Sequence, residues 1–130
     1  MATILVIEDD NQLRHTLHLI LGAAGHTVLE ARSGLEGLRI FKQNAPDLVI
    51  TDVVMPIVNG TKVVQQIARL TPGARMVIMS GQVRRDFLEL TKRFGAAEAL
   101  AKPFSRDDLL AAVARALGPA PREIGGLSIR

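Results

Sequence analysis

The sequence contains no cysteine, no tryptophan and no tyrosine, and aromatic residues make up only 3% of its 130 residues. Without cysteine the chain has no disulfide, no thiolate metal site and no catalytic thiol. With four phenylalanines as its only aromatic residues, it offers no platform on which nucleic-acid bases would stack. These absences favour a cytoplasmic protein and argue against direct binding to nucleic acid.

The sequence also lacks a concentrated region of positive charge, although its formal net charge is +3. Residues 1–83 carry seven basic and seven acidic side chains, and residues 84–130 carry nine and six. The excess is scattered, which indicates a solvated basic surface. The apolar runs are too short to span a membrane and no signal peptide precedes the first predicted strand, so no membrane association is expected.

Five short apolar segments alternate with five segments of helical periodicity, and this pattern fits one domain of about 1–117. The alternation predicts a parallel sheet covered by helices on both faces, with right-handed crossovers, but it does not fix the strand order. Residues 118–130 lose the periodicity and are expected to form a flexible tail or linker. The predicted strands are Thr3–Ile7, Thr27–Ala31, a strand from Leu48 that ends at Asp52, Arg75–Met79, and the weak Glu98–Ala101.

Residues that favour helix N-termini precede the helical segments. Asp10 or Asn11 precedes the first, and Asn59 the third. Ser33 with Glu36, and Ser105 with Asp108, have the spacing of capping boxes. The apolar stripes are Leu13, Leu17, Ile20, Leu21 and Ala24; Leu35, Leu38, Ile40 and Phe41; Val63, Val64, Ile67 and Leu70; Val83, Phe87, Leu90 and Phe94; and Leu109, Leu110, Val113, Ala116 and Leu117.

His15 and His18 lie three residues apart in the first helix, a spacing that can place two metal ligands on one face. A zinc site needs at least three protein ligands, and no third one is evident nearby. Both histidines are therefore expected on the solvent side of the helix.

Polar groups stand at the ends of four of the five predicted strands. They are the acids Glu8 and Asp9, then Asp52, Ser80 and Lys102. Because the carboxyl ends of parallel strands share one edge of the sheet, these groups are expected to gather there. Several carboxylates in one crevice favour a cation, and hard oxygen ligands suit Mg²⁺ better than zinc. A lysine and a hydroxyl beside such a metal indicate a site for a phosphoryl group.

Four motifs in this order and spacing resemble the receiver domain of two-component response regulators. They are Ile4-Leu5-Val6-Ile7-Glu8-Asp9-Asp10, Asp47 to Gly60 around Asp52, Met76-Val77-Ile78-Met79-Ser80-Gly81, and Ala101-Lys102-Pro103-Phe104. The resemblance covers about residues 3–117. It implies a flavodoxin-like (βα)5 fold, a three-layer sandwich whose five parallel strands have the order 2-1-3-4-5.

The resemblance also implies a role for each residue of the site. Asp52 would accept a phosphoryl group from a phosphohistidine of a sensor histidine kinase or phosphotransfer protein, with Mg²⁺ as cofactor. Glu8, Asp9 and Asp52 would hold the metal together with the backbone carbonyl of Val54. Ser80 and Lys102 would contact the phosphoryl group. Such a domain signals to a downstream protein target and is not a conventional turnover enzyme.

The chain departs from the family pattern at Ala99, where an aromatic residue usually stands three residues before the lysine. Without a ring at this position, the phosphorylation signal is expected to leave through residues 81–87. No output domain follows residue 117, so the chain is expected to be a stand-alone receiver or one excised from a longer protein.

Two alternatives on the same fold stay open. A flavin mononucleotide-binding module would need phosphate-binding hydroxyl groups after the first strand, where this chain has three acids. A magnesium-dependent phosphatase would need a general acid or base near Asp52, commonly two residues on, where this chain has Val54.

Overall fold

A computed structural model of the chain describes residues 1–53, 60–81, 98–118, 122–124 and 127–129. Its centre is a parallel sheet of five strands in the order β2-β1-β3-β4-β5, which confirms the predicted architecture and strand order. The strands are β1 (Thr3–Ile7), β2 (Thr27–Ala31), β3 (Leu48–Asp52), β4 (Met76–Ser80) and β5 (Glu98–Ala101).

The register of the strands brings their carboxyl ends close to one level. Ile7 at the end of β1 is paired with Thr51 of β3, and Asp52 at the end of β3 is paired with Met79 of β4. The last residue of β4, Ser80, is paired with Ala101, the last residue of β5. Residues that follow these strands therefore emerge along one edge of the sheet.

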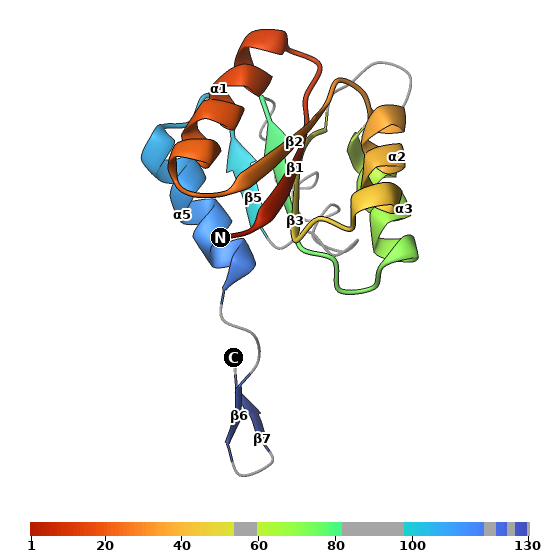
Figure 1. The fold of residues 1–130 in the computed structure, drawn as a ribbon, viewed down its shortest axis with the longest axis vertical. Helices are drawn as coiled ribbons and strands as arrows, with labels where there is room; N and C mark the ends of the chain where they lie inside the picture. Colours follow the sequence, from red (N-terminus) through yellow and green to blue (C-terminus); the bar gives the residue numbers. More distant parts are fainter. Residues whose placement is uncertain (54–59, 82–97, 119–121, 125–126, 130) are drawn as a thin grey trace.

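Helices cover both faces of the sheet, as the alternating sequence predicts. In Figure 1, α1 (Asn11–Ala23) and α5 (Arg106–Leu117) lie on one side, and α2 (Gly34–Asn44) and α3 (Gly60–Leu70) on the other. The predicted helix between β4 and β5 falls in residues 82–97, outside the described residues, as does its apolar stripe from Val83 to Phe94.

The side chains of the central strands alternate between two hydrophobic clusters, as expected when both faces of a sheet are covered. Ile4 and Val6 of β1 pack in the cluster that contains residues of α1 and α5. Leu5 and Ile7 pack in the cluster that contains residues of α2 and α3. Side chains therefore pack on both faces of β1, β3 and β4, and this packing gives the carboxyl ends of the three strands a rigid support.

Three predicted core positions are exposed, one of which is Ala24 at the C-terminal cap of α1. Leu35 in the first turn of α2 and Leu70 at the end of α3 lie on the surface, with 60% and 48% of their area exposed. Both stand at a helix end, where the apolar stripe runs past the area that the sheet covers. The remaining predicted positions of α3, Val63, Val64 and Ile67, are fully buried.

The helix caps agree with the sequence pattern in part. Asp10 caps α1, and Ser105 with Asp108 forms a complete capping box at α5. At α2 the Ser33 hydroxyl accepts from the backbone N–H of Glu36. The Glu36 carboxylate accepts from the N–H of Arg32 at 3.0 Å, one residue before the cap, so the predicted reciprocal box is wrong in this half. The predicted cap Asn59 lies outside the described residues.

The segment after α5 contains two short strands that were not predicted. β6 (Arg122–Ile124) and β7 (Leu127–Ile129) pair antiparallel and form a sheet of their own, which Figure 1 shows apart from the five-stranded sheet. Among the described helices, none combines the length and the apolar composition needed to cross a lipid bilayer.

Gly37 allows α2 to approach the strand that leads to Glu8. A Cβ atom at this position would lie 2.4 Å from Cδ1 and 2.7 Å from Cγ1 of the buried Ile7. We expect Gly37→Ala to lower the free energy of unfolding by about 1–3 kcal/mol, because overpacking outweighs alanine's better helix propensity. Urea denaturation followed by circular dichroism measures this change.

Gly22 provides a matched control because it lies in α1 with no atom within 4 Å of a built Cβ. Gly22→Ala should raise the free energy of unfolding by about 0.5–1 kcal/mol through helix propensity alone. Equal effects of the two substitutions would show that the contact with Ile7 does not restrict position 37.

Candidate functional site

The polar groups predicted to gather at the carboxyl edge of the sheet do lie there. Glu8 and Asp9 follow β1, Asp52 ends β3, Ser80 ends β4, and Lys102 follows β5. Glu8, Asp52 and Ser80 are buried, with 0%, 5% and 1% of their area exposed, whereas Asp9 is exposed. The floor of the site is therefore buried, and Asp9 is the acid at its solvent-exposed side.

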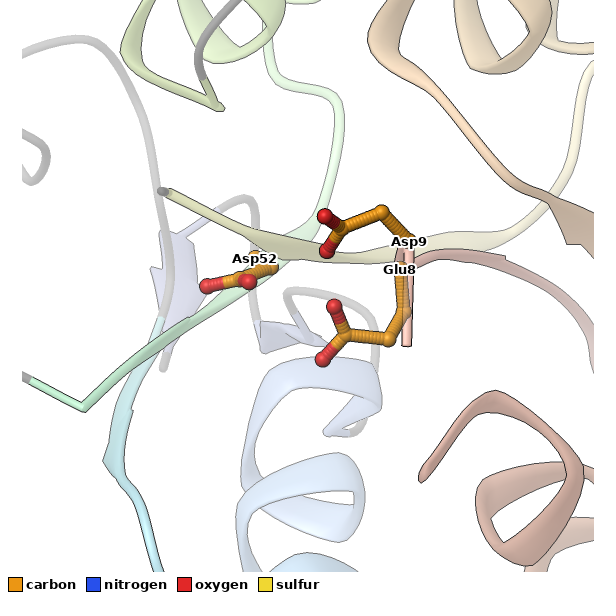
Figure 2. Close-up of side chains that lie close together, drawn as sticks. All are labelled: Glu8, Asp9 and Asp52. Atoms are coloured by element: carbon orange, nitrogen blue, oxygen red, sulfur yellow. The ribbon is translucent and has the colours of Figure 1, made fainter. Parts of the chain in front are cut away.

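Three carboxylates converge at this edge. One oxygen from each of Glu8, Asp9 and Asp52 lies within 4.8 Å of the others. Figure 2 shows the side chains of Glu8 and Asp9 reaching from the end of β1 toward Asp52 on β3. A group of carboxylate oxygens at this separation is a suitable ligand set for a hard divalent cation.

Lys102 brings a positive charge into contact with two of these acids. Its Nζ atom lies 2.6 Å from Oε1 of Glu8 and 3.2 Å from Oδ2 of Asp52. The lysine side chain is 22% exposed, and the Glu8 and Asp52 side chains are 1% and 7% exposed. The ammonium group therefore bridges the two buried carboxylates and compensates part of their negative charge.

The ionisation of Glu8 reflects this crowded environment. The pKa of Glu8 is raised from 4.5 to about 7, chiefly by burial and further by the charge of Asp52, against the opposing hydrogen bond and charge of Lys102. For Lys102, burial alone would lower the pKa, but the hydrogen bond and charge of Glu8, with the charge of Asp52, raise it above 10.5. The acids thus carry more negative charge than the lysine neutralises, which favours the addition of a cation.

Ser80 and Lys102 are connected through the backbone. The N–H of Lys102 donates to the carbonyl of Ser80 at 2.8 Å and extends the β4–β5 ladder past Ala101. The backbones of Ser80 and Lys102 are therefore neighbours at the ends of β4 and β5, and the lysine side chain reaches from there to Asp52 and Glu8.

Two parts of the predicted site fall outside the described residues. Val54, whose backbone carbonyl was predicted as a metal ligand, is one, and residues 82–87 of the predicted signalling segment are the other. Ala99 is described: it lies in β5 opposite Ile78 and is partly buried against the cluster under α2 and α3.

Both histidines of α1 were expected on the solvent side of the helix, and this is fully so for His15 but only partly so for His18. His15 is exposed, as predicted. His18 is 42% exposed at its side chain and lies 2.8 Å from Glu30 of β2, measured from Nδ1 to Oε2.

One residue next to the site was not identified from the sequence. Arg14 of α1 is 8% exposed and donates to the backbone carbonyl of Glu8 at 2.8 Å. Its position on the buried stripe of α1, three residues before Leu17 and seven before Leu21, is the signal that would have found it. A charged residue on a buried helix stripe needs a polar partner, and here the partner belongs to the site.

Comparison with known proteins agrees with this arrangement. The sequence model of the response regulator receiver domain family matches residues 4–114. Sporulation initiation phosphotransferase F of Bacillus subtilis is 29% identical over 114 residues, which cover 88% of this chain and 92% of that protein. The DNA-binding transcriptional regulator NtrC of Azospirillum brasilense is 37% identical over 116 residues, 89% of this chain but only 24% of the regulator.

The fold comparison leads to the same family. A response regulator receiver domain protein from Clostridium thermocellum superimposes with a TM-score of 0.85 at 37% identity, over 90% of this chain and 94% of that one. The family match spans most of the chain and includes the strand ends that carry Glu8, Asp9, Asp52, Ser80 and Lys102. The chain therefore belongs to the receiver domain family of two-component response regulators.

Proposed function

We propose that the chain accepts a phosphoryl group on Asp52 from a phosphohistidine of a sensor histidine kinase or phosphotransfer protein, with Mg²⁺ as cofactor. The observation that carries the proposal is the environment of Asp52. This buried carboxylate ends the central strand within reach of two further acids and in contact with the Lys102 ammonium group. Such a combination of acids and a cation suits the transfer of an anionic group.

The residues at the edge fit a magnesium ion. Glu8, Asp9 and Asp52 supply hard oxygen donors, and the carboxylates exceed the positive charge available from Lys102. We infer that these three residues hold Mg²⁺, and by family resemblance that the carbonyl of Val54 contributes. Mg²⁺ bound there supplies positive charge that offsets the negative charge of the phosphoryl oxygens.

The protein's own side chains have distinct parts in the transfer. An Asp52 oxygen attacks phosphorus, the phosphorus–nitrogen bond of the donor breaks, and the imidazole nitrogen keeps the electron pair. Lys102 lies beside the attacking carboxylate, where its charge stabilises the phosphoryl oxygens, and the Ser80 hydroxyl donates a hydrogen bond to one of them. Later hydrolysis of the acyl phosphate regenerates the Asp52 carboxylate.

A protein partner fits the surface beside the site. A pocket of about 440 Å³ adjoins Lys102, and residues of α1 and of the segment after β5 line it: Asp10, Gln12, Leu13, Thr16, Lys102, Pro103 and Phe104. Its mixed apolar and polar lining suits side chains of a docking protein. The similarity to a phosphotransferase of sporulation supports a place in a phosphorelay, which we propose is cytoplasmic and acts on a downstream protein target.

Phosphodonor labelling tests the proposal. We expect purified protein treated with acetyl phosphate and Mg²⁺ to gain the mass of one phosphoryl group, which is then lost slowly by hydrolysis. Asp52→Asn should abolish the added mass completely, because an amide cannot form the acyl phosphate. Intact-protein mass spectrometry measures the labelled fraction.

Asp107→Asn is the matched control, since Asp107 is an exposed acid in the first turn of α5 and is not one of the three converging carboxylates. This variant should be labelled like the wild type. Equal labelling of the Asp52→Asn variant would remove Asp52 as the acceptor. Release of phosphate ions without accumulation of the added mass on the protein would instead indicate a phosphatase.

A further inference from the structure

Arg14 is a buried cation whose hydrogen bonds connect three elements around the site. Its Nη1 donates to the Glu8 carbonyl at 2.8 Å, and its Nη2 donates to Oδ1 of Asn11 at 2.6 Å. Its Nε donates to Oε1 of Glu30 at 3.2 Å, and the other oxygen of Glu30 lies 2.8 Å from Nδ1 of His18. The guanidinium group thus joins β2 and the start of α1 to the residue that follows β1.

The carbonyl that Arg14 binds belongs to a peptide with a special position. It is the peptide that joins Glu8 and Asp9, the first two acids of the site. The N–H of Glu8 donates to Ala31 of β2 at 3.0 Å, and the β1 strand ends one residue before Glu8. Beyond this bond the chain leaves the sheet, and the Glu8 carbonyl accepts from Arg14.

The planarity of the peptide gives this bond its consequence. Glu8 is anchored to β2 through its N–H, so the direction of its carbonyl is set by rotation about its own Cα–C bond. Because the peptide unit is planar, that direction also determines where the Cα atom of Asp9 lies. A rotation about the Cα–C bond of Glu8 would therefore move Asp9 and its carboxylate. The observed orientation brings both carboxylates within 4.8 Å of Asp52.

We propose that Arg14 is a positioning residue, which holds the Glu8–Asp9 peptide in the orientation that directs both carboxylates toward Asp52. This inference rests on the proposed function, because it assigns Arg14 to the same cation site. Glu30 orients the guanidinium through Nε, and His18 holds the second oxygen of Glu30. The acid pair is thereby supported from the side of β2 and α1, and Lys102 contacts it from the side of β5.

Arg75 provides the matched control that separates positioning from simple structural support. Its guanidinium also donates to a backbone carbonyl, that of Leu117 at the end of α5. Arg75 precedes β4 and so lies at the opposite end of that strand from Ser80. Removing either arginine breaks a guanidinium–carbonyl bond, but only Arg14 contacts the backbone of the acid pair.

The experiment is a Mg²⁺ titration of the metal-free protein, followed by the backbone amide resonances of the residues after β1. We expect Arg14→Met to raise the Kd for Mg²⁺ about tenfold, the size of effect seen when support for a metal ligand is lost. Arg14→Lys should recover little, because an ammonium group cannot hold three acceptors in a planar fork. Arg75→Met should leave the Kd unchanged within about twofold, although it too lowers stability.

Each result decides the proposal. A Kd within about twofold of the wild type in folded Arg14→Met and Arg14→Lys would overturn it. If Arg14→Met does not fold, Glu30→Met replaces it, because methionine offers Arg14 Nε no oxygen acceptor. An unchanged Kd in that variant and in Arg14→Lys has the same meaning. Wild-type protein that binds Mg²⁺ but takes no phosphoryl group would overturn only the proposed function. Wild-type protein that binds no Mg²⁺ would overturn both.

Discussion

Lys102→Met is expected to lower the free energy of unfolding of the metal-free protein by about 2–3 kcal/mol at pH 8. Methionine keeps the apolar stem but removes the ammonium group that contacts Glu8 and Asp52. Both carboxylates are at least nine-tenths buried, so the substitution removes the ammonium group that bridges two buried acids. Breaking a buried pair from one side is costly because the remaining charge stays desolvated.

The loss of stability in Lys102→Met should depend on pH, because Glu8 no longer carries a negative charge once it binds a proton. At pH 5, below its pKa of about 7, Glu8 is already largely protonated in the folded wild type. We therefore expect the Lys102→Met effect at pH 5 to fall to about 1 kcal/mol. Urea denaturation at the two pH values, followed by circular dichroism, measures the difference.

Arg115→Met is the control, because Arg115 forms an ion pair of nearly the same length in a different environment. Its Nε lies 2.7 Å from Oε1 of Glu98, but the arginine side chain is 59% exposed. A pair screened by water contributes less than about 1 kcal/mol, with little change between the two pH values. Equal losses for the two variants would show that burial of the Glu8–Lys102 pair has no energetic consequence.

Glu8→Gln should have the opposite effect and raise the free energy of unfolding by about 1–3 kcal/mol at pH 8 without metal. The folded-state pKa of Glu8, about 7, exceeds its usual 4.5, so the folded protein holds this proton more tightly than the unfolded chain. The wild type accordingly loses stability at this residue as the pH rises from about 4.5 to about 7. Glutamine has no proton to lose, so the variant avoids that loss.

Mg²⁺ should make the wild type more stable than the Glu8→Gln variant. A cation that binds the folded protein adds stability according to its concentration and affinity, and the wild type offers it one more carboxylate than the variant does. Thermal unfolding of both proteins at pH 8, with and without Mg²⁺, tests this. Glu98→Gln, which changes the acid of the surface pair with Arg115, should show no Mg²⁺ effect of its own. A wild type more stable than Glu8→Gln in the absence of metal would contradict the argument.

Sequence patterns predicted most of the site because each of its members stands directly at a strand end. The apolar strands that end at Asp52 and Ser80 leave little freedom in where those side chains emerge. The same reasoning placed Glu8, Asp9 and Lys102 at the edge. The strand order came from family resemblance, since alternation of strands and helices is compatible with more than one order.

The errors have equally specific causes. Arg14 was missed because a charged residue on a helix is usually solvated, and only the structure shows the carbonyl that it binds. Leu35 and Leu70 belong to apolar stripes but are exposed, because periodicity does not show where a helix extends past its sheet. The spacing of Ser33 and Glu36 predicts a reciprocal capping box, but the Glu36 carboxylate accepts from the backbone N–H of Arg32, one residue before the cap.

The contact between Glu8 and Lys102 has a consequence for the order in which the protein folds. It joins residues 94 positions apart, linking the ends of the first and fifth strands of the parallel sheet, and β5 lies at an edge of that sheet, paired only with β4. Contacts between such distant residues form late, because the whole intervening loop must be closed. During synthesis the three acids after β1 leave the ribosome long before the lysine does. Any shorter nascent chain therefore carries the repulsion of its acids without the ammonium group that offsets part of it, and this group arrives only when the fifth strand docks.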